Sequence, residues 1–208
     1  PQALNPAFPL KPHQEEAVAW LQRCARLIPQ RRGVLLADEM GLGKTLEILT
    51  FAAWALEKGI FPGLHLGDGP FRPILVVAPL MLVENETWQG DMTKFFRPGT
   101  FGPVMVLRGS TLQALRIARG RETDLGRPLL DLDEIQRHRV VITNYETVTN
   151  FQHSLAQVRD GRSIWSMVVT DEAQEFKNPQ ARISHAIKAL HPDFHIASTG
   201  TPVENRLL

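Results

Sequence analysis

The sequence has little of several features that would point to a particular environment. It contains one cysteine, Cys24, so no disulfide can form within the chain, which fits a reducing compartment. Its apolar runs are far shorter than the roughly 20 residues that cross a bilayer, so we expect no membrane association. The first residues show no basic stretch followed by an apolar stretch and a cleavage site. We therefore expect an intracellular protein, cytoplasmic in a bacterium or nuclear in a eukaryote.

Net charge and histidine spacing are equally unspecific. The formal net charge is +1, and this value neither supports nor excludes a nucleic-acid partner, because such binding depends on a local basic surface. His191 and His195 are four residues apart, but Pro192 lies between them and argues against one helical face. We therefore predict no metal site made from protein side chains alone. Cys24 lies among apolar residues at helical spacing and is predicted to be a core residue rather than a nucleophile.

Alternating strand and helix signals run through the 208 residues, of which 43% are hydrophobic and 22% charged. Short continuous apolar runs predict strands at 34–37, 74–78, 104–107, 139–143, 167–170 and 195–198. Helical spacing predicts helices near 13–28, 45–58, 82–96, 112–119, 148–158 and 179–190. Glycine and proline predict a long surface loop at 60–73, and mixed charges predict a variable connection at 120–137. The alternation predicts one three-layer α/β domain over residues 1–208, with a mainly parallel central sheet.

The stretch DEMGLGKT, residues 38–45, lies between the first predicted strand and a predicted helix. A strand, a glycine-bearing turn and a helix in this order can form a phosphate-binding loop, because backbone N–H groups and the helix N-terminus face one point. Lys44 would reach the β- and γ-phosphates of a nucleotide, and Thr45 would bind a magnesium ion. Asp38 stands where the usual pattern has glycine. The alternative interpretation is a glycine-rich turn whose lysine is merely solvated.

Two adjacent carboxylates, Asp171 and Glu172, directly follow the predicted strand 167–170. Ligands of parallel sheets bind outside the carboxyl ends of the strands, so residues at this place are candidates for a site. Asp171 would hold the magnesium ion, directly or through water, and Glu172 would orient and deprotonate an attacking water. An Asp-Glu pair alone is more often a solvated turn. Its position behind a buried strand, downstream of a matching loop, favours the functional interpretation.

Five segments occur in order along the chain: DEMGLGKT (38–45), APLMLVENETW (78–88), VVITNYETV (140–148), DEAQEFKNP (171–179) and STGTPVEN (198–205). Together they resemble motifs I, Ia, Ib, II and III of superfamily-two helicase-like ATPases, specifically the Swi/Snf-type DNA translocases. DEMGLGKT has that family's spelling, so Asp38 becomes a family marker. LKPHQ (10–14) resembles the upstream segment in which a glutamine, here Gln14, reads the adenine edge. LRGS (107–110) resembles the short segment before motif Ib.

The resemblance implies an N-terminal RecA-like ATP-binding lobe, with ATP and Mg²⁺ as ligands and double-stranded DNA as the usual track. The family couples hydrolysis to translocation and typically does not separate strands. The implied nucleotide-binding residues are Gln14, Asp38, Met40, Gly41, Leu42, Gly43, Lys44 and Thr45. The implied catalytic residues are Lys44, Asp171 and Glu172, and the implied metal ligands are Thr45 and Asp171.

By the same resemblance, DNA contacts would come from the segments that follow the strands 74–78 and 139–143. These segments follow the phosphate backbone, so binding independent of DNA sequence is expected. The residues concerned are Pro79, Leu80, Thr143 and Asn144. Four arginines could add attraction to phosphate, although a solvated surface explains them at least as well because acids are interspersed: Arg108, Arg116, Arg119 and Arg121. The role of Lys177 is similarly open.

Two departures from the family pattern bear on activity. Gln174 stands where many members have a histidine that relays between the lobes, so we expect activity to persist and leave its coupling open. The sequence ends at Leu208, just after motif III. The second RecA-like lobe of the full-length chain, with its arginine finger, is therefore expected to be absent. An arginine finger contributes about 10³–10⁵ in rate, so we expect weak ATP binding and negligible turnover without it.

Two other functions remain as alternatives. One is a strand-separating helicase lobe that acts on DNA or RNA, which the spelling of motifs I and Ia disfavours. The other is a non-catalytic nucleic-acid-binding scaffold, against which the intact Lys44, Thr45, Asp171 and Glu172 argue. The biological pathway is left open, because remodelling, transcription, repair and defence all use this type of protein.

Overall fold

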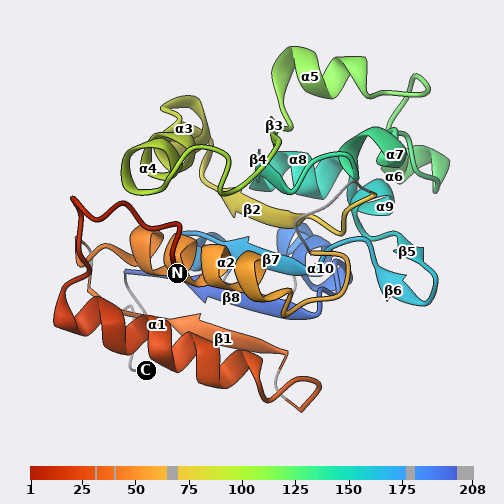
Figure 1. Cartoon of the computed structure of the whole chain (residues 1–208). Coiled ribbons are helices and arrows are strands. Elements are labelled where there is room, and N and C mark those ends of the chain that lie inside the picture. Colours follow the sequence, from red (N-terminus) through yellow and green to blue (C-terminus); the bar gives the residue numbers. More distant parts are fainter. Residues whose placement is uncertain (31, 40, 65–69, 177–180, 201–208) are drawn as a thin grey trace, which may run out of the picture.

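The computed structural model describes residues 1–30, 32–39, 41–64, 70–176 and 181–200, with the backbone alone at 123, 175 and 176. The described residues contain a six-stranded sheet whose strands are all parallel, with helices on both faces (Figure 1). In spatial order the strands are β1 (Gly33–Leu36), β8 (Phe194–Ser198), β7 (Met167–Thr170), β2 (Ile74–Ala78), β4 (Val140–Asn144) and β3 (Val104–Val106). The predicted three-layer α/β fold is confirmed, and each predicted strand is present to within two residues.

Helices cover each face of this sheet and bury the alternate residues of its strands. The helices are α1 (Pro12–Ala25), α2 (Lys44–Lys58), α3 (Leu80–Glu84), α4 (Thr87–Phe95), α5 (Gly109–Ala114), α6 (Glu122–Leu125), α7 (Leu132–Ile135), α8 (Tyr145–Asn150), α9 (Gln152–Leu155) and α10 (Arg182–Ala189). One core cluster joins α1, α2 and α4 to residues such as Val76 and Val169, and the other joins α8 and α10 to residues such as Val77 and Val168. Strands buried on both faces explain the continuous apolar runs in the sequence.

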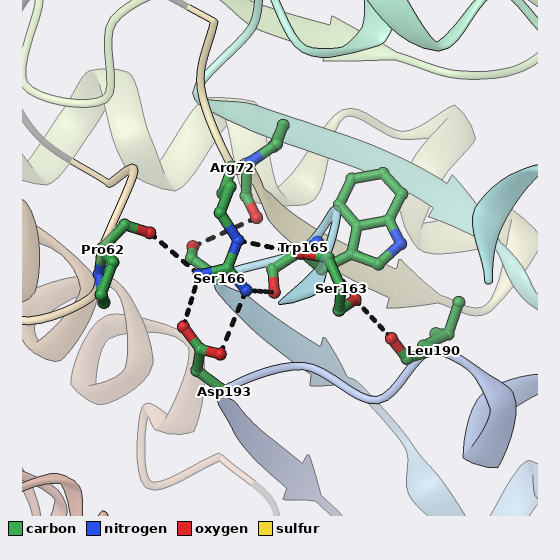
Figure 2. Close-up of polar contacts among 8 residues, drawn as sticks. Pro62, Arg72, Ser163, Trp165, Ser166, Leu190 and Asp193 are labelled. Carbon is green, nitrogen blue, oxygen red and sulfur yellow. Dashed lines mark hydrogen bonds and ion pairs between the residues drawn. The ribbon is translucent and has the colours of Figure 1, made fainter. Parts of the chain in front are cut away.

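At the amino ends of the strands, the guanidinium group of Arg72 forms hydrogen bonds with several segments of the chain (Figure 2). Arg72 lies just before β2, and its Nη1 and Nη2 donate to the two carboxylate oxygens of Asp193, at 2.6 and 3.0 Å. Its Nε donates to Ser163 O at 2.8 Å, Nη1 to Pro62 O at 3.0 Å and Nη2 to Trp165 O at 3.1 Å. The bidentate pair therefore connects the chain that enters β2 with the chain that enters β7 and β8.

Two predicted helices prove to be broken. The prediction of one helix over 82–96 is wrong, because α3 ends before Asn85 and α4 begins after Glu86, which has a left-handed φ of 53°. The prediction over 148–158 is also wrong: α8 starts at Tyr145, α9 follows it, and the last residues enter a small hairpin of β5 (Val158–Arg159) and β6 (Arg162–Ser163).

The predicted connections also differ from what the structure shows. Instead of a helix over 112–119, α5 ends at Ala114, and Arg116 forms an antiparallel bridge with Leu130. The connection 120–137 contains α6 and α7, and buries apolar residues such as Leu129 and Leu130. The stretch 60–73 is more than a surface loop, since three apolar side chains are buried in its described part: Phe61, Leu64 and Phe71.

Cys24 is 2% exposed within the core on the α1 and α2 face, as its spacing predicts. In the described ranges of the chain, no helix has the length and apolar character that a membrane crossing requires.

Candidate functional site

The predicted site residues follow strands that are neighbours in the sheet. β1, β8 and β7 lie side by side, and their carboxyl ends lead into the phosphate loop, Thr199 and Asp171 respectively. The main-chain N–H of Thr199 donates to Leu36 O at 3.1 Å, and that of Asp171 donates to Val77 O at 2.8 Å. The fold therefore brings segments that are far apart in the sequence to one edge of the sheet.

The phosphate loop depends on two glycines in the left-handed region of backbone conformation. Gly41 has a φ of 86° and Gly43 a φ of 92°. Gly43 is the N-cap of the 15-residue helix α2, and no side chain in the described part of the chain caps that helix. The N–H groups of a helix's first turn have no intrahelical acceptor, and the helix dipole adds partial positive charge there. The start of α2 is therefore suited to a phosphate group.

The ammonium group of Lys44 is held by the loop itself. Its Nζ donates to the main-chain carbonyl oxygens of Asp38 at 2.9 Å and Glu39 at 3.0 Å. Main-chain carbonyls carry only partial negative charge, so the pairing leaves the charge of the ammonium group unneutralised by these partners. A phosphate oxygen would be a stronger, charge-assisted acceptor for the same group.

Gln14 connects α1 to the phosphate loop. Its Nε2 donates to Leu42 O at 3.1 Å, and its Oε1 accepts from the main-chain N–H of Lys11 at 3.0 Å. His13 Nε2 lies 3.2 Å from the same Leu42 carbonyl oxygen. A Cβ atom at Gly43 would lie only 2.4 Å from Gln14 Nε2, so the glutamine amide packs directly on the loop. The predicted adenine contact of Gln14 stays a prediction.

Asp171 is buried, and its carbonyl oxygen and both carboxylate oxygens accept hydrogen bonds. Its Oδ2 accepts from the indole Nε1 of Trp88 at 3.2 Å, and its Oδ1 accepts from the main-chain N–H of Glu172 at 3.1 Å. The hydroxyl of Tyr145 donates to its main-chain carbonyl at 2.6 Å. Burial raises the pKa of the Asp171 carboxyl, and the hydrogen bond from Trp88 opposes this rise.

Glu172 is linked to the segment after β8 through Gln174. Gln174 Nε2 donates to Glu172 Oε2 at 2.7 Å, and Thr199 Oγ1 donates to Gln174 Oε1 at 2.7 Å. The amide of Gln174 thus bridges the acidic pair and the last strand. Glu172 has a left-handed φ of 52°, a conformation that costs a non-glycine residue about 1–3 kcal/mol and recurs at functional sites.

The donor set at this edge suits magnesium. Thr45 supplies a hydroxyl in the first turn of α2, and Asp171 supplies a carboxylate, and both are oxygen ligands of the kind that Mg²⁺ prefers. Within the described part of the chain, no group of three or more His, Cys, Asp or Glu residues could hold a metal ion. An ion at this edge would therefore depend on phosphate and water oxygens as well.

Comparison with known proteins agrees with this arrangement. The SNF2-related domain family matches residues 13–208. The chain belongs to that family. It is 40% identical over its whole length to the Zorya protein ZorD of Escherichia coli O139:H28, of which it covers 18%. It is 30% identical to the mouse DNA repair and recombination protein RAD54-like, with 96% of this chain and 24% of the relative covered.

A solved structure supports the SNF2 assignment. The Sulfolobus solfataricus SWI2/SNF2 ATPase core in complex with dsDNA superposes with a TM-score of 0.67 at 28% identity, covering 96% of this chain and 34% of that chain. The predicted Swi/Snf-type resemblance and RecA-like fold are thereby confirmed. The chain spans between 18% and 34% of the lengths of these proteins.

In this SNF2-family chain, the segments predicted to contact DNA present different groups. Pro79 is the N-cap of α3, after which Leu80 is 44% and Met81 70% exposed. Thr143 is fully buried, and its hydroxyl donates to Leu107 O at 2.8 Å. Asn144 caps α8 by accepting from the main-chain N–H of Thr147 at 2.8 Å. The side chains of Thr143 and Asn144 therefore have structural roles, and the exposed surface is at the start of α3.

Two of the four arginines, Arg108 and Arg116, make contacts within the chain. Arg108 pairs with Glu84 at 2.7 Å, and Arg116 lies over the ring of Phe151 at 5.8 Å. The remaining two, Arg119 and Arg121, are exposed. Met40 and Lys177 lie outside the described residues.

Sequence reasoning missed three side chains of this SNF2 site: Trp88, Tyr145 and Glu47. Glu47 is fully buried in the first turn of α2, and neither carboxylate oxygen has a hydrogen-bond partner among the described residues. Burial, followed by the charge of Asp38, raises the pKa of Glu47 to about 7. Trp88 and Tyr145 lie within the quoted segments 78–88 and 140–148, but no pattern in the sequence shows where the polar tip of a buried aromatic residue points.

Proposed function

We propose that residues 1–208 are the N-terminal, ATP-binding lobe of a DNA-dependent ATPase that couples ATP hydrolysis to translocation on double-stranded DNA or to remodelling of nucleoprotein. The observation that carries this proposal is the meeting of the phosphate loop, Asp171 with Glu172, and Thr199 at one edge of the sheet. Ligands of open parallel sheets bind at this edge. Membership in the SNF2-related family supports the same proposal.

In this proposal each side chain has a separate task. The uncapped start of α2 and the Lys44 ammonium bind the phosphates of ATP, and Lys44 exchanges its two carbonyl acceptors for phosphate oxygens. Thr45 and Asp171 would hold Mg²⁺, which when bound neutralises charge on the phosphates. Glu172 orients the attacking water and accepts its proton. Gln174 and Thr199 hold the Glu172 carboxylate in place by the two 2.7 Å hydrogen bonds.

Double-stranded DNA is proposed as the partner because a related SWI2/SNF2 ATPase core was solved in complex with dsDNA. The contact would lie at the segments that follow β2 and β4, along the phosphate backbone and without dependence on base sequence. A second RecA-like lobe is proposed as the other partner, because the relatives are several times longer than this chain. Such a lobe would supply the arginine finger that phosphoryl transfer requires.

The proposal is tested in a two-lobed protein that contains this chain. Glu172→Gln should retain ATP binding and lose hydrolysis, because the amide keeps the shape of the side chain but cannot accept the proton of water. The measurement is phosphate release with duplex DNA, single-stranded DNA or RNA, beside nucleotide affinity. Stimulation by duplex DNA above the other two supports a translocase. Unchanged hydrolysis in Glu172→Gln would remove Glu172 as the base, and stimulation only by single strands would favour a strand-separating helicase.

A further inference from the structure

Two buried aromatic side chains donate hydrogen bonds to Asp171 from outside its own strand. Trp88, 1% exposed, comes from α4 and donates to Oδ2 at 3.2 Å. Tyr145, 6% exposed, is the first residue of α8 and donates to the main-chain carbonyl at 2.6 Å. These residues are 83 and 26 positions away from Asp171 in the sequence.

The two hydrogen bonds constrain different degrees of freedom. The indole N–H of Trp88 fixes the rotation of the carboxylate group, together with the main-chain N–H of Glu172 on the other oxygen. A carboxylate has about four lone-pair directions, and the hydrogen bonds from Trp88, the Glu172 main chain and Ser198 occupy three of them, so room for a further ligand remains. The Tyr145 hydroxyl fixes the main chain from which the carboxylate projects.

We propose that Trp88 and Tyr145 are positioning residues that hold Asp171 in the orientation in which it takes the Mg²⁺ of bound ATP. This inference rests on the proposed nucleotide site. Hydrogen-bond donors behind a metal ligand orient it, and their loss typically lowers metal affinity or activity by about 10–100-fold. The competing explanation is that Asp171 merely satisfies the polar tips of two buried aromatic rings, as buried Trp and Tyr require. The two explanations differ in whether loss of the donors affects metal binding.

The test measures how far Mg²⁺ tightens the binding of a fluorescent ATP analogue, mant-ATP. The 208-residue chain is titrated with mant-ATP in Mg²⁺ and again in EDTA, and the ratio of the two dissociation constants gives the metal effect. Trp88→Phe and Tyr145→Phe keep an aromatic ring and remove only the donor. Each should reduce this ratio by about tenfold, and neither should change the affinity in EDTA. If the two residues had only a structural role, their substitution would lower the affinity for mant-ATP in Mg²⁺ and in EDTA by the same factor.

Trp165→Phe is the matched control. Trp165 is fully buried and its indole Nε1 donates to Leu155 O at 2.6 Å, but it lies at the amino end of β7, the end opposite Asp171. This variant loses a comparable hydrogen bond and should keep the parent's Mg²⁺ ratio. Far-UV circular dichroism checks that each variant is folded, and if Trp88→Phe does not fold, Tyr145→Phe decides the question.

The outcomes separate the two proposals. If the parent shows a Mg²⁺ effect and both Trp88→Phe and Tyr145→Phe retain it, the positioning role is wrong while the nucleotide site stands. If the parent binds no mant-ATP in either condition, the proposed function itself fails, and the inference fails with it. A reduced ratio in the two variants and an unchanged ratio in Trp165→Phe supports the positioning role.

Discussion

The two ends of the sheet satisfy their polar groups to different degrees. At the amino ends, Arg72 uses Nε, Nη1 and Nη2 in five hydrogen bonds, two of them to a carboxylate (Figure 2). At the carboxyl ends, and among the described residues, the carboxylate of Glu47 is buried without a partner and Lys44 pairs only with main-chain carbonyls. Glu172 also has an unfavourable left-handed backbone conformation there.

This difference indicates that the two ends of the sheet have different roles. Buried polar groups that are fully paired stabilise a unique fold, whereas unpaired or strained groups cost free energy and persist where a ligand or a reaction uses them. The Arg72 network therefore contributes to stability, whereas Lys44 stays available for the ligand that we propose. Substitutions at the two ends should separate stability from binding.

The largest effect is expected from Arg72→Met, which keeps the apolar part of the side chain and removes the guanidinium group. The carboxylate of Asp193 and three carbonyls would then lose a donor, and the Arg72 side chain is only 14% exposed. We expect the free energy of unfolding to fall by about 4 kcal/mol, measured by urea denaturation. The affinity of the folded protein for ATP should not change.

The exposed pair Arg137–Glu134 provides the control for this variant. Arg137 has a side chain that is 74% exposed and bonds Glu134 at 2.8 Å. Arg137→Met should change stability by less than about 1 kcal/mol. Equal effects of Arg72→Met and Arg137→Met would contradict the assigned stabilising role of the amino end.

A somewhat smaller loss of stability is expected at acid pH, where His195 in β8 becomes protonated. Burial lowers the pKa of His195 from 6.5 to about 4 in the folded state, and its Nε2 lies 3.0 Å from Thr170 Oγ1. Between pH 6.5 and 4 the His195 imidazole is protonated in the unfolded chain but not in the folded protein. The stability that the protein has above pH 6.5 is therefore lost as the pH falls towards 4. The loss should reach at most about 3 kcal/mol.

The test compares urea denaturation of the parent and His195→Gln across this pH range. The variant has no imidazole at position 195 to protonate, so its stability should fall less steeply between pH 6.5 and 4. Parallel pH profiles for the two proteins would show that other groups cause the acid dependence.

The smallest losses of stability are expected from substitution of two glycines of the phosphate loop. Both have positive φ, but a Cβ at Gly41 would meet no described atom within 4 Å, whereas one at Gly43 would lie 2.4 Å from Gln14 Nε2. Gly41→Ala should cost about 1 kcal/mol of stability from backbone strain alone, and Gly43→Ala about 2 kcal/mol. Thermal denaturation measures both.

The double variant Gly43→Ala with Gln14→Ala then isolates the contact between the loop and α1. In the Gln14→Ala background, Gly43→Ala has no glutamine amide to clash with. It should therefore lower stability by less than it does in the parent, and by about as much as Gly41→Ala. If the costs simply add, Gln14 does not constrain the phosphate loop through Gly43.

The sequence predicted what depends on local pattern. The strands were predictable because both faces of the sheet are covered, which makes residues 74–78 and 167–170 continuously apolar. The end of α2 was predictable because Gly59 adopts the left-handed conformation of a helix C-cap. The phosphate loop and the acidic pair were recognised from residue type and order along the chain.

The contacts that hold the site together could not be predicted in the same way. Trp88 and Asp171 are joined by one hydrogen bond across 83 residues, and Arg72 and Asp193 across 121. Such pairs depend on how strands are ordered in space, which residue spacing does not encode. The break between α3 and α4 was missed because Glu86 adopts a left-handed conformation that is rare for a residue of its kind.

The most direct test of the account is the ATP affinity of the 208-residue chain, by titration with mant-ATP in Mg²⁺, for the parent, Lys44→Ala and Lys58→Ala. Lys44 is in the first turn of α2 at the phosphate loop, whereas Lys58 is exposed in the last turn of the same helix. We predict saturable binding by the parent and by Lys58→Ala, and at least about tenfold weaker binding by Lys44→Ala, because the ammonium contact with the phosphates is lost. Equal affinities for all three proteins would contradict a nucleotide site at the carboxyl end of the sheet.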